Sequence, residues 1–152
     1  MSSLHENEIG DRVLNAAFAL HRDLGPGLLE SVYEVLLAHA LTESGLEVQR
    51  QVVIPIHYKS IQLDEGFRAD LIVEEKVILE LKSVERINPA HKKQLLTYLK
   101  LSGLKVGYLL NFGEALMKDG ITRIINGHLP PCSPCRRERK QIGPQSTSSQ
   151  GW

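Results

Sequence analysis

Two carboxylates and a lysine lie within short apolar segments, where charged side chains are costly to bury. Asp70 lies in the segment 67–73, and Glu80 and Lys82 lie in the segment 77–84. Both segments are rich in Val, Ile, Leu and Phe, and the three charged residues between them are typical of a turn. The sequence therefore predicts a β-hairpin that carries three ionisable groups.

The length of the turn decides which side chains meet across this hairpin. A three-residue turn, 74–76, places Asp70 directly opposite Glu80, whereas a two-residue turn places it opposite Leu79. Side chains alternate between the faces of a strand, so Ile72 is expected on the same face as Asp70, and a shift of one residue would turn every side chain over. The polar and apolar pattern favours the three-residue turn. The two carboxylates are then expected about 5 Å apart at Cβ.

A carboxylate pair of this kind is destabilising unless cations neutralise it, and Lys82 supplies only one positive charge. Mg²⁺ prefers oxygen ligands and typically takes one or two carboxylates together with water and a substrate phosphate. Lys82, one pleat beyond Glu80, would lie beside such an ion, where an ammonium orients an attacking water or stabilises developing negative charge. A solvated strand face with salt bridges between these residues explains the spacing equally well.

Two amphipathic helices are expected before the hairpin. The first runs from about residue 7 to residue 24, with Asn7 as its N-cap and a Gly-Pro-Gly stop after it. The second runs over residues 28–44. Its apolar spacing predicts that one stripe faces the core: Leu29, Val32, Leu36 and Ala40.

Further strands complete a sheet around the hairpin. Residues 47–58 alternate between polar and apolar and predict a strand, in which Pro55 indicates a sheet edge or a bulge. After the hairpin, Asn88-Pro89 is typical of the start of a helix. The apolar residues 105–112 then predict a buried strand parallel to the one that carries Glu80. A last short strand is expected over residues 121–125.

Several of these residues fall into motifs of a known superfamily. Asp70, followed after nine residues by Glu80-Leu81-Lys82, resembles the D-(x)n-ExK signature of the PD-(D/E)XK nucleases, although Ala69 replaces the proline of that name. Residues 27–33, GLLESVY, match the motif of the GxxExxY proteins, a group of small prokaryotic members. Residues 94–98, QLLTY, are similar to the QxxxY motif of the RecB-like branch.

The resemblance covers roughly residues 5–125. It implies an α/β fold with a restriction-endonuclease-like core, in which a mixed β-sheet with a central hairpin is flanked by α-helices. It also implies a phosphodiesterase that depends on Mg²⁺ or Mn²⁺ and hydrolyses DNA or RNA.

The resemblance assigns roles to individual residues. The implied metal ligands are two carboxylates and a backbone carbonyl, with a further carboxylate that assists directly or through water: Asp70, Glu80, Leu81 and Glu30. Lys82 would position the nucleophilic water, and Gln94 would steady it. The implied substrate contacts are two tyrosines and two lysines: Tyr98, Tyr33, Lys92 and Lys93.

Structural explanations for these side chains stay open. Glu30 lies in the first turn of a helix, where the helix dipole favours any carboxylate. Tyr33 can equally pack against the core. Gln94 and Tyr98, four residues apart, can mark a helix boundary between core and solvent, and residues 91–93 can be a solvated charge run.

Two other classes of function fit the same sequence. The first is a non-catalytic nucleic-acid- or protein-binding module that keeps the nuclease fold. The complete set of Asp70, Glu80 and Lys82 argues against it, whereas the small size of the chain argues for it. The second is a scaffold, either a homodimer or a regulatory subunit of a larger complex.

The composition limits these alternatives. The chain has 152 residues, with 18 basic and 18 acidic side chains, so it fits one domain and its total charge favours no partner. Residues 126–152 hold four basic residues and one acidic residue, which leaves residues 1–125 at about −3 and excludes a generally basic nucleic-acid-binding surface. No membrane-spanning run and no signal peptide are evident, so a cytoplasmic protein is expected.

The last segment, residues 126–152, is predicted to be a disordered tail beyond a nuclease-like domain of residues 1–125. It holds both cysteines, Cys132 and Cys135, in a proline-rich context. The three ligands that this segment could offer are fewer than the four of a structural zinc site. We therefore expect this cysteine pair to be incidental.

Overall fold

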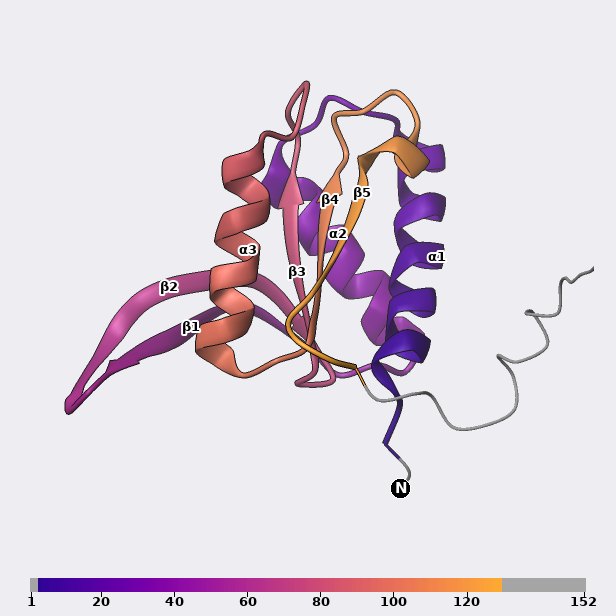
Figure 1. Cartoon of the computed structure of the whole chain (residues 1–152). Helices are drawn as coiled ribbons and strands as arrows, with labels where there is room; N and C mark the ends of the chain where they lie inside the picture. Colours follow the sequence, from indigo (N-terminus) through magenta and orange to yellow (C-terminus); the bar gives the residue numbers. More distant parts are fainter. Residues whose placement is uncertain (1–2, 130–152) are drawn as a thin grey trace, which may run out of the picture.

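The computed structural model describes residues 3–129, which form one mixed β-sheet covered by helices on both faces (Figure 1). The elements in chain order are α1 (Glu6–Leu24), α2 (Glu30–Glu43), β1 (Val48–Tyr58), β2 (Ile61–Val73), β3 (Val77–Lys82), α3 (Pro89–Ser102), β4 (Val106–Asn111), the 3-10 helix η1 (Met117–Gly120) and β5 (Ile121–Ile125). Within the described residues the sheet has five strands in sequence order, β1-β2-β3-β4-β5. The predicted α/β architecture is confirmed.

The sheet separates two hydrophobic cores. The first core lies against α1 and α2 and includes Val13, Leu37, Leu71, Leu79 and Leu110. The second core lies against α3 and includes Ala69, Ile72, Ile78, Leu95 and Leu109. Side chains of β3 alternate between these two cores, so this central strand is buried on both faces.

Helix α1 begins two residues earlier than its predicted cap would allow. The N-cap is His5, whose ring Nδ1 accepts a hydrogen bond from the backbone of Asn7, while the Glu8 carboxylate accepts one from the His5 backbone. This reciprocal arrangement is a capping box in which histidine takes the place of serine or threonine. The prediction of Asn7 as the cap is therefore wrong, because histidine is an uncommon residue in that role.

Helix α2 turns a different face to the core than the sequence predicts. Its buried residues are Tyr33, Glu34, Leu37, Ala38 and Leu41. The predicted stripe lies largely on the outside, with Leu29 73% exposed and Val32 and Leu36 more than a third exposed. The helix carries apolar residues on nearly all sides, so their periodicity could not distinguish the two faces. As a consequence, a carboxylate that had not been predicted as a site residue, Glu34, points into the protein.

The hairpin of β2 and β3 has the predicted register. The paired residues are Leu71 with Leu79, Ile72 with Ile78 and Val73 with Val77. The three-residue turn between them is also confirmed, and two of its residues, Glu74 and Glu75, have positive φ angles. Because Val73 pairs with Val77, Asp70 and Glu80 are brought next to each other three residues farther along the two strands.

Strand β1 lies at the edge of the sheet and forms a long hairpin with β2 that projects from the body (Figure 1). The register between the two strands shifts between Ile54 and Ile56. Pro55 lies at this irregularity, as predicted, because proline has no N–H to donate to a regular ladder.

Beyond the hairpin, β3, α3 and β4 form a crossover in which β3 and β4 are parallel, as predicted. Asn88 caps α3 through its side chain, and Gly103 ends it in the left-handed conformation. Lys82 at the end of β3 is paired with Asn111 at the end of β4. The crossover therefore brings a fully buried amide next to the strand end that carries the lysine.

The described chain continues past the predicted domain boundary at residue 125. The backbone N–H of Asn126 donates to Lys105, its side-chain amide donates to the carbonyls of Leu99 and Leu104, and Leu129 packs against the first core. Residues 130–152, with Cys132 and Cys135, lie outside the described residues. Within residues 3–129, no helix combines the length and apolar character needed to cross a membrane.

Candidate functional site

Asp70 and Glu80 meet at the point where the regular pairing of β2 and β3 ends, one step beyond Leu71 and Leu79. The backbone N–H of Asp70 donates to Glu80 Oε2 over 3.1 Å. The backbone N–H of Leu81 donates to Asp70 Oδ2 over 2.9 Å. Each carboxylate thus binds the backbone of the neighbouring strand and takes over a role that backbone carbonyls have in a regular ladder.

The alternation of β2 is broken at Asp70. Ala69 and Ile72 both belong to the second core. Leu71 and Val73 belong to the first core. Residues three apart in a regular strand point to opposite faces. The regular alternation is therefore broken between Ala69 and Leu71, beside the Asp70 carboxylate.

Burial changes the ionisation of both carboxyl groups. Glu80 is only 6% exposed, and its burial, followed by the charge of Asp70, raises its pKa from 4.5 to about 8. Burial also raises the pKa of Asp70, whereas the hydrogen bond from Leu81 lowers it. The Lys82 ammonium lowers the pKa of both groups without cancelling the rise. Placing two negative charges here is therefore costly in the absence of a further cation.

A third carboxylate, Glu34, completes this acidic region from α2. It is 5% exposed, and its Oε2 accepts from Arg50 Nε over 3.1 Å, an ion pair between α2 and β1. Its Oε1 accepts from Gln51 Nε2 over 2.7 Å. The charge of Glu34 contributes to the raised pKa of Asp70. Sequence reasoning missed this residue because it assigned the wrong face of α2 to the core; a stripe built on Tyr33 and Leu37 would have included it.

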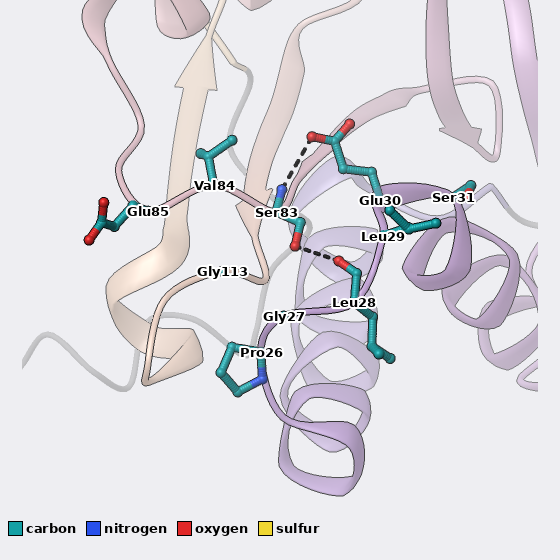
Figure 2. A pocket seen from close by; sticks show the side chains of 10 residues that line it. All are labelled: Pro26, Gly27, Leu28, Leu29, Glu30, Ser31, Ser83, Val84, Glu85 and Gly113. Carbon is teal, nitrogen blue, oxygen red and sulfur yellow. Dashed lines mark hydrogen bonds between the residues drawn. The ribbon is translucent and has the colours of Figure 1, made fainter.

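Glu30 lies at the rim of an open pocket of about 750 Å³ between the start of α2 and the residues that follow β3. Figure 2 shows its carboxylate accepting a hydrogen bond from the backbone of Ser83 over 3.3 Å, while the Ser83 hydroxyl donates to the carbonyl of Leu28 over 2.6 Å. The charge of Glu30 raises the pKa values of Asp70 and Glu80. The pocket is therefore adjacent to the acidic pair, and its lining includes a second carboxylate, Glu85.

Tyr33 lies in the first core and is fully buried. Its hydroxyl donates to the carbonyl of Gly25 over 2.5 Å and accepts from the backbone of Leu28 over 3.2 Å, and its ring stacks on Phe112. These contacts fix the loop that leads into α2 and so position Glu30. These contacts support the packing role that the sequence left open for Tyr33. Its hydroxyl is hydrogen-bonded to backbone groups of the protein itself.

The remaining predicted site residues lie on β3 and α3. Lys82 is half-buried, and among residues 3–129 no hydrogen bond or ion pair engages its ammonium. Tyr98 stacks on Phe67 with ring centroids 3.6 Å apart. Burial raises the pKa of Tyr98, and the charges of Glu80 and Asp70 raise it further. Three more predicted residues are exposed on this helix and make no described contact with the carboxylates: Gln94, Lys92 and Lys93.

The donor set fits a hard divalent cation in its chemistry. Asp70 and Glu80 offer carboxylate oxygens beside the backbone carbonyl of Leu81, and Mg²⁺ and Mn²⁺ prefer such ligands. Within the described part of the chain, no group of three or more His, Cys, Asp or Glu side chains is arranged so that it could hold a metal ion. Mg²⁺ usually keeps several waters and binds through only one or two carboxylates. A cation bound between Asp70 and Glu80 would lower the raised pKa of Glu80.

Comparison with known proteins agrees with this geometry. The family model of the PD-(D/E)XK nuclease superfamily matches residues 7–124, from near the start of α1 to near the end of β5. Neither the curated proteins nor the solved structures gave a significant match. The matched span contains all the predicted site residues, and the sheet with its central hairpin and flanking helices is the restriction-endonuclease-like fold. The chain belongs to the PD-(D/E)XK nuclease superfamily.

Proposed function

We propose that this protein is a metal-dependent phosphodiesterase that hydrolyses DNA or RNA. The observation that carries the proposal is the pair of Asp70 and Glu80, which meet at the end of the central hairpin, together with the charge of Lys82, which lowers the pKa of both. Their spacing resembles the D-(x)n-ExK signature of the superfamily to which the chain belongs, which supports this proposal.

The motifs favour a narrower assignment within the superfamily. Residues 27–33 match the GxxExxY pattern, and residues 94–98 match the QxxxY pattern of the RecB-like branch. The contacts of Glu30 and Tyr33 support the GxxExxY assignment. Tyr33 fixes the loop that leads into α2, and Glu30 at the start of that helix accepts a hydrogen bond from Ser83, which follows β3.

Asp70, Glu80 and the Leu81 carbonyl would hold Mg²⁺ or Mn²⁺, with Glu30 assisting through water. When bound, the ion lowers the pKa of a ligated water and neutralises charge at the scissile phosphate. The buried acids provide the negative charge for this ion, and the hydrogen bond from the Leu81 N–H fixes one oxygen of Asp70.

Lys82 would orient the attacking water, since its charge acts on both carboxylates and no hydrogen bond or ion pair within residues 3–129 engages its ammonium. Gln94 would steady this water, and Tyr98 would support the substrate backbone from α3. The exposed Lys92 and Lys93, in the first turns of α3, would contact phosphates. A cytoplasmic location and association into a homodimer or larger complex stay predictions.

One observation favours a second candidate, a binding module that keeps the nuclease fold without catalysis. Asp70 and Glu80 already accept hydrogen bonds from backbone N–H groups, so they serve the pairing of the strands even without a metal. A protein that used the carboxylates only in this way would bind nucleic acid or another protein and cut nothing.

Cleavage assays distinguish the two candidates. Labelled single- and double-stranded DNA and RNA are incubated with Mg²⁺ or Mn²⁺, and wild type is compared with Lys82→Ala, with an EDTA control. Lys59→Ala, at the tip of the β1–β2 hairpin, is the matched control for loss of a lysine. We expect metal-dependent cutting that is lost in Lys82→Ala and kept in Lys59→Ala. Metal binding without cutting of any substrate by wild type would favour the binding module.

A further inference from the structure

Gln51 has a backbone conformation that is unusual for a strand. It lies within β1, yet its φ angle is +51°. Non-glycine residues with positive φ are uncommon, and glutamine has no special tendency toward this region. Such a conformation persists only where the surrounding contacts hold it, and it occurs preferentially at functional sites. Gln51 lies next to Asp70, so contacts at the acidic pair can hold its backbone in this conformation.

The unusual backbone coincides with an interruption of the pairing between β1 and β2. Arg50 pairs with Leu71 and Val52 pairs with Ala69, but the pair expected between them, Gln51 with Asp70, is not formed. Both strands are therefore irregular at the same level, β1 at Gln51 and β2 at Asp70.

The irregularity directs two consecutive side chains to one acceptor. Neighbouring residues in a regular strand point to opposite faces. Here Arg50 and Gln51 both reach Glu34, through Oε2 at 3.1 Å and Oε1 at 2.7 Å respectively. The positive φ of Gln51 allows this convergence, because it breaks the alternation at that residue.

The same amide nitrogen of Gln51 lies 3.5 Å from Asp70 Oδ1, at the long end of the hydrogen-bond range. The other oxygen of Asp70, Oδ2, accepts from the Leu81 N–H. Donors from β1 and β3 thus lie at the two oxygens of a carboxylate on β2. Two donors at separate oxygens define the plane of a carboxylate, whereas one donor leaves it free to rotate.

We propose that Gln51 is a positioning residue for the metal site: its amide links the Asp70 carboxylate to the buried Glu34 of α2 and thereby sets the orientation of Asp70. This inference rests on the proposed function, since it assigns Asp70 to a metal. Glu34 acts as the anchor, because it is buried and held by Arg50, and Gln51 transmits that anchoring.

The test uses a substitution that separates the side chain of Gln51 from its backbone. Gln51→Gly removes the amide but suits a positive φ, so the backbone of β1 is expected to keep its conformation. Lys59→Gly is the matched control, because Lys59 has a φ of 55° in the same hairpin, in the turn at its far end. Binding of Mn²⁺ is measured by calorimetry on the whole chain, and stability is measured by thermal unfolding without metal.

We expect Gln51→Gly to bind Mn²⁺ at least fivefold more weakly than wild type, at a temperature where thermal unfolding shows both proteins to be folded. Lys59→Gly should bind as wild type does. Equal affinity of Gln51→Gly and wild type would overturn the inference and leave the proposed function intact, provided that Asp70→Ala abolishes binding. A fall in affinity of the same size in Lys59→Gly would also overturn it, since that indicates a general effect of glycine in the hairpin. If wild type binds no Mn²⁺, the proposed function fails and this inference fails with it.

Discussion

The carboxylate of Glu80 lies 3.1 Å from the backbone nitrogen of Asp70 and accepts its hydrogen bond. The side chain of one acidic residue therefore supports the main chain of the other. Because Glu80 is almost fully buried, its ionisation and the pairing of the two strands are coupled. Changes in pH, metal concentration or charge at this point should all be measurable through the stability of the fold.

The first prediction concerns pH. The pKa of Glu80 is about 8 in the folded protein, above its ordinary value of 4.5, so the folded state binds one more proton than the unfolded state between these values. The free energy of unfolding without metal should therefore fall as pH rises from about 5 to 8, at a slope of up to about 1.4 kcal/mol per pH unit. Urea unfolding at several pH values measures this slope.

The control for this prediction is Glu80→Gln, which cannot ionise and should show a flatter dependence over the same range. Saturating Mg²⁺ should likewise flatten the wild-type profile, because a bound cation favours the ionised carboxylate. A wild-type profile that rises between pH 5 and 8 would contradict the assignment.

The second prediction concerns the coupling between the two acids. Asp70→Asn removes one negative charge but keeps an oxygen that accepts from Leu81. The pKa of Glu80 should fall, because the Asp70 charge contributes to its rise, yet it should stay above 4.5, because burial is the larger cause. Carbon NMR titration of the Glu80 carboxyl group measures the shift. No change in this pKa would mean that the charge of Asp70 does not contribute to the raised pKa of Glu80.

The third prediction concerns Asn111, at the end of β4. Its fully buried Oδ1 accepts from the backbone N–H groups of Val84 and Gly113, both over 3.0 Å. Asn111→Ala leaves both donors unpaired, so the free energy of unfolding should fall by about 1–3 kcal/mol for each group that water cannot reach. Denaturant unfolding measures the loss, with the exposed Asn15→Ala as the control. Equal stability of the two variants would contradict this account of the loop after β3.

The fourth prediction distinguishes packing from substrate contact at Tyr33. Tyr33→Phe keeps the stacking on Phe112 but removes the hydrogen bonds to Gly25 and Leu28. The free energy of unfolding should fall by about 0.5–1.5 kcal/mol per lost bond. Tyr58→Phe, at an exposed position of the hairpin, should change little. If Tyr33→Phe were as stable as wild type but weakened substrate binding, the residue would contact substrate and the packing role would be wrong.

The parts of the fold that the sequence predicts correctly are those that depend on local chemistry. The turn length predicts the register of β2 and β3, Pro55 predicts the irregular edge strand, and Asn88-Pro89 predicts the start of α3. Each of these signals depends on a few neighbouring residues and on rules that tertiary contacts rarely override.

The parts that were missed depend on contacts between distant segments. The apolar surface of α2 is almost continuous around the helix, so only its packing against the sheet decides that Glu34 is buried. Gln51 gives no local sign of a positive φ, since the conformation is explained by Glu34 and Asp70 on other elements. The periodicity of the sequence therefore could not predict that Glu34 and Gln51 lie near Asp70.

The break at Pro55 has a consequence for how copies of this chain can associate. An edge strand normally offers a row of free N–H and C=O groups to a strand of another molecule. On β1 that row lacks a donor at Pro55 and changes register between Ile54 and Ile56. A homodimer that joins two copies of β1 in one continuous ladder across this boundary is therefore disfavoured.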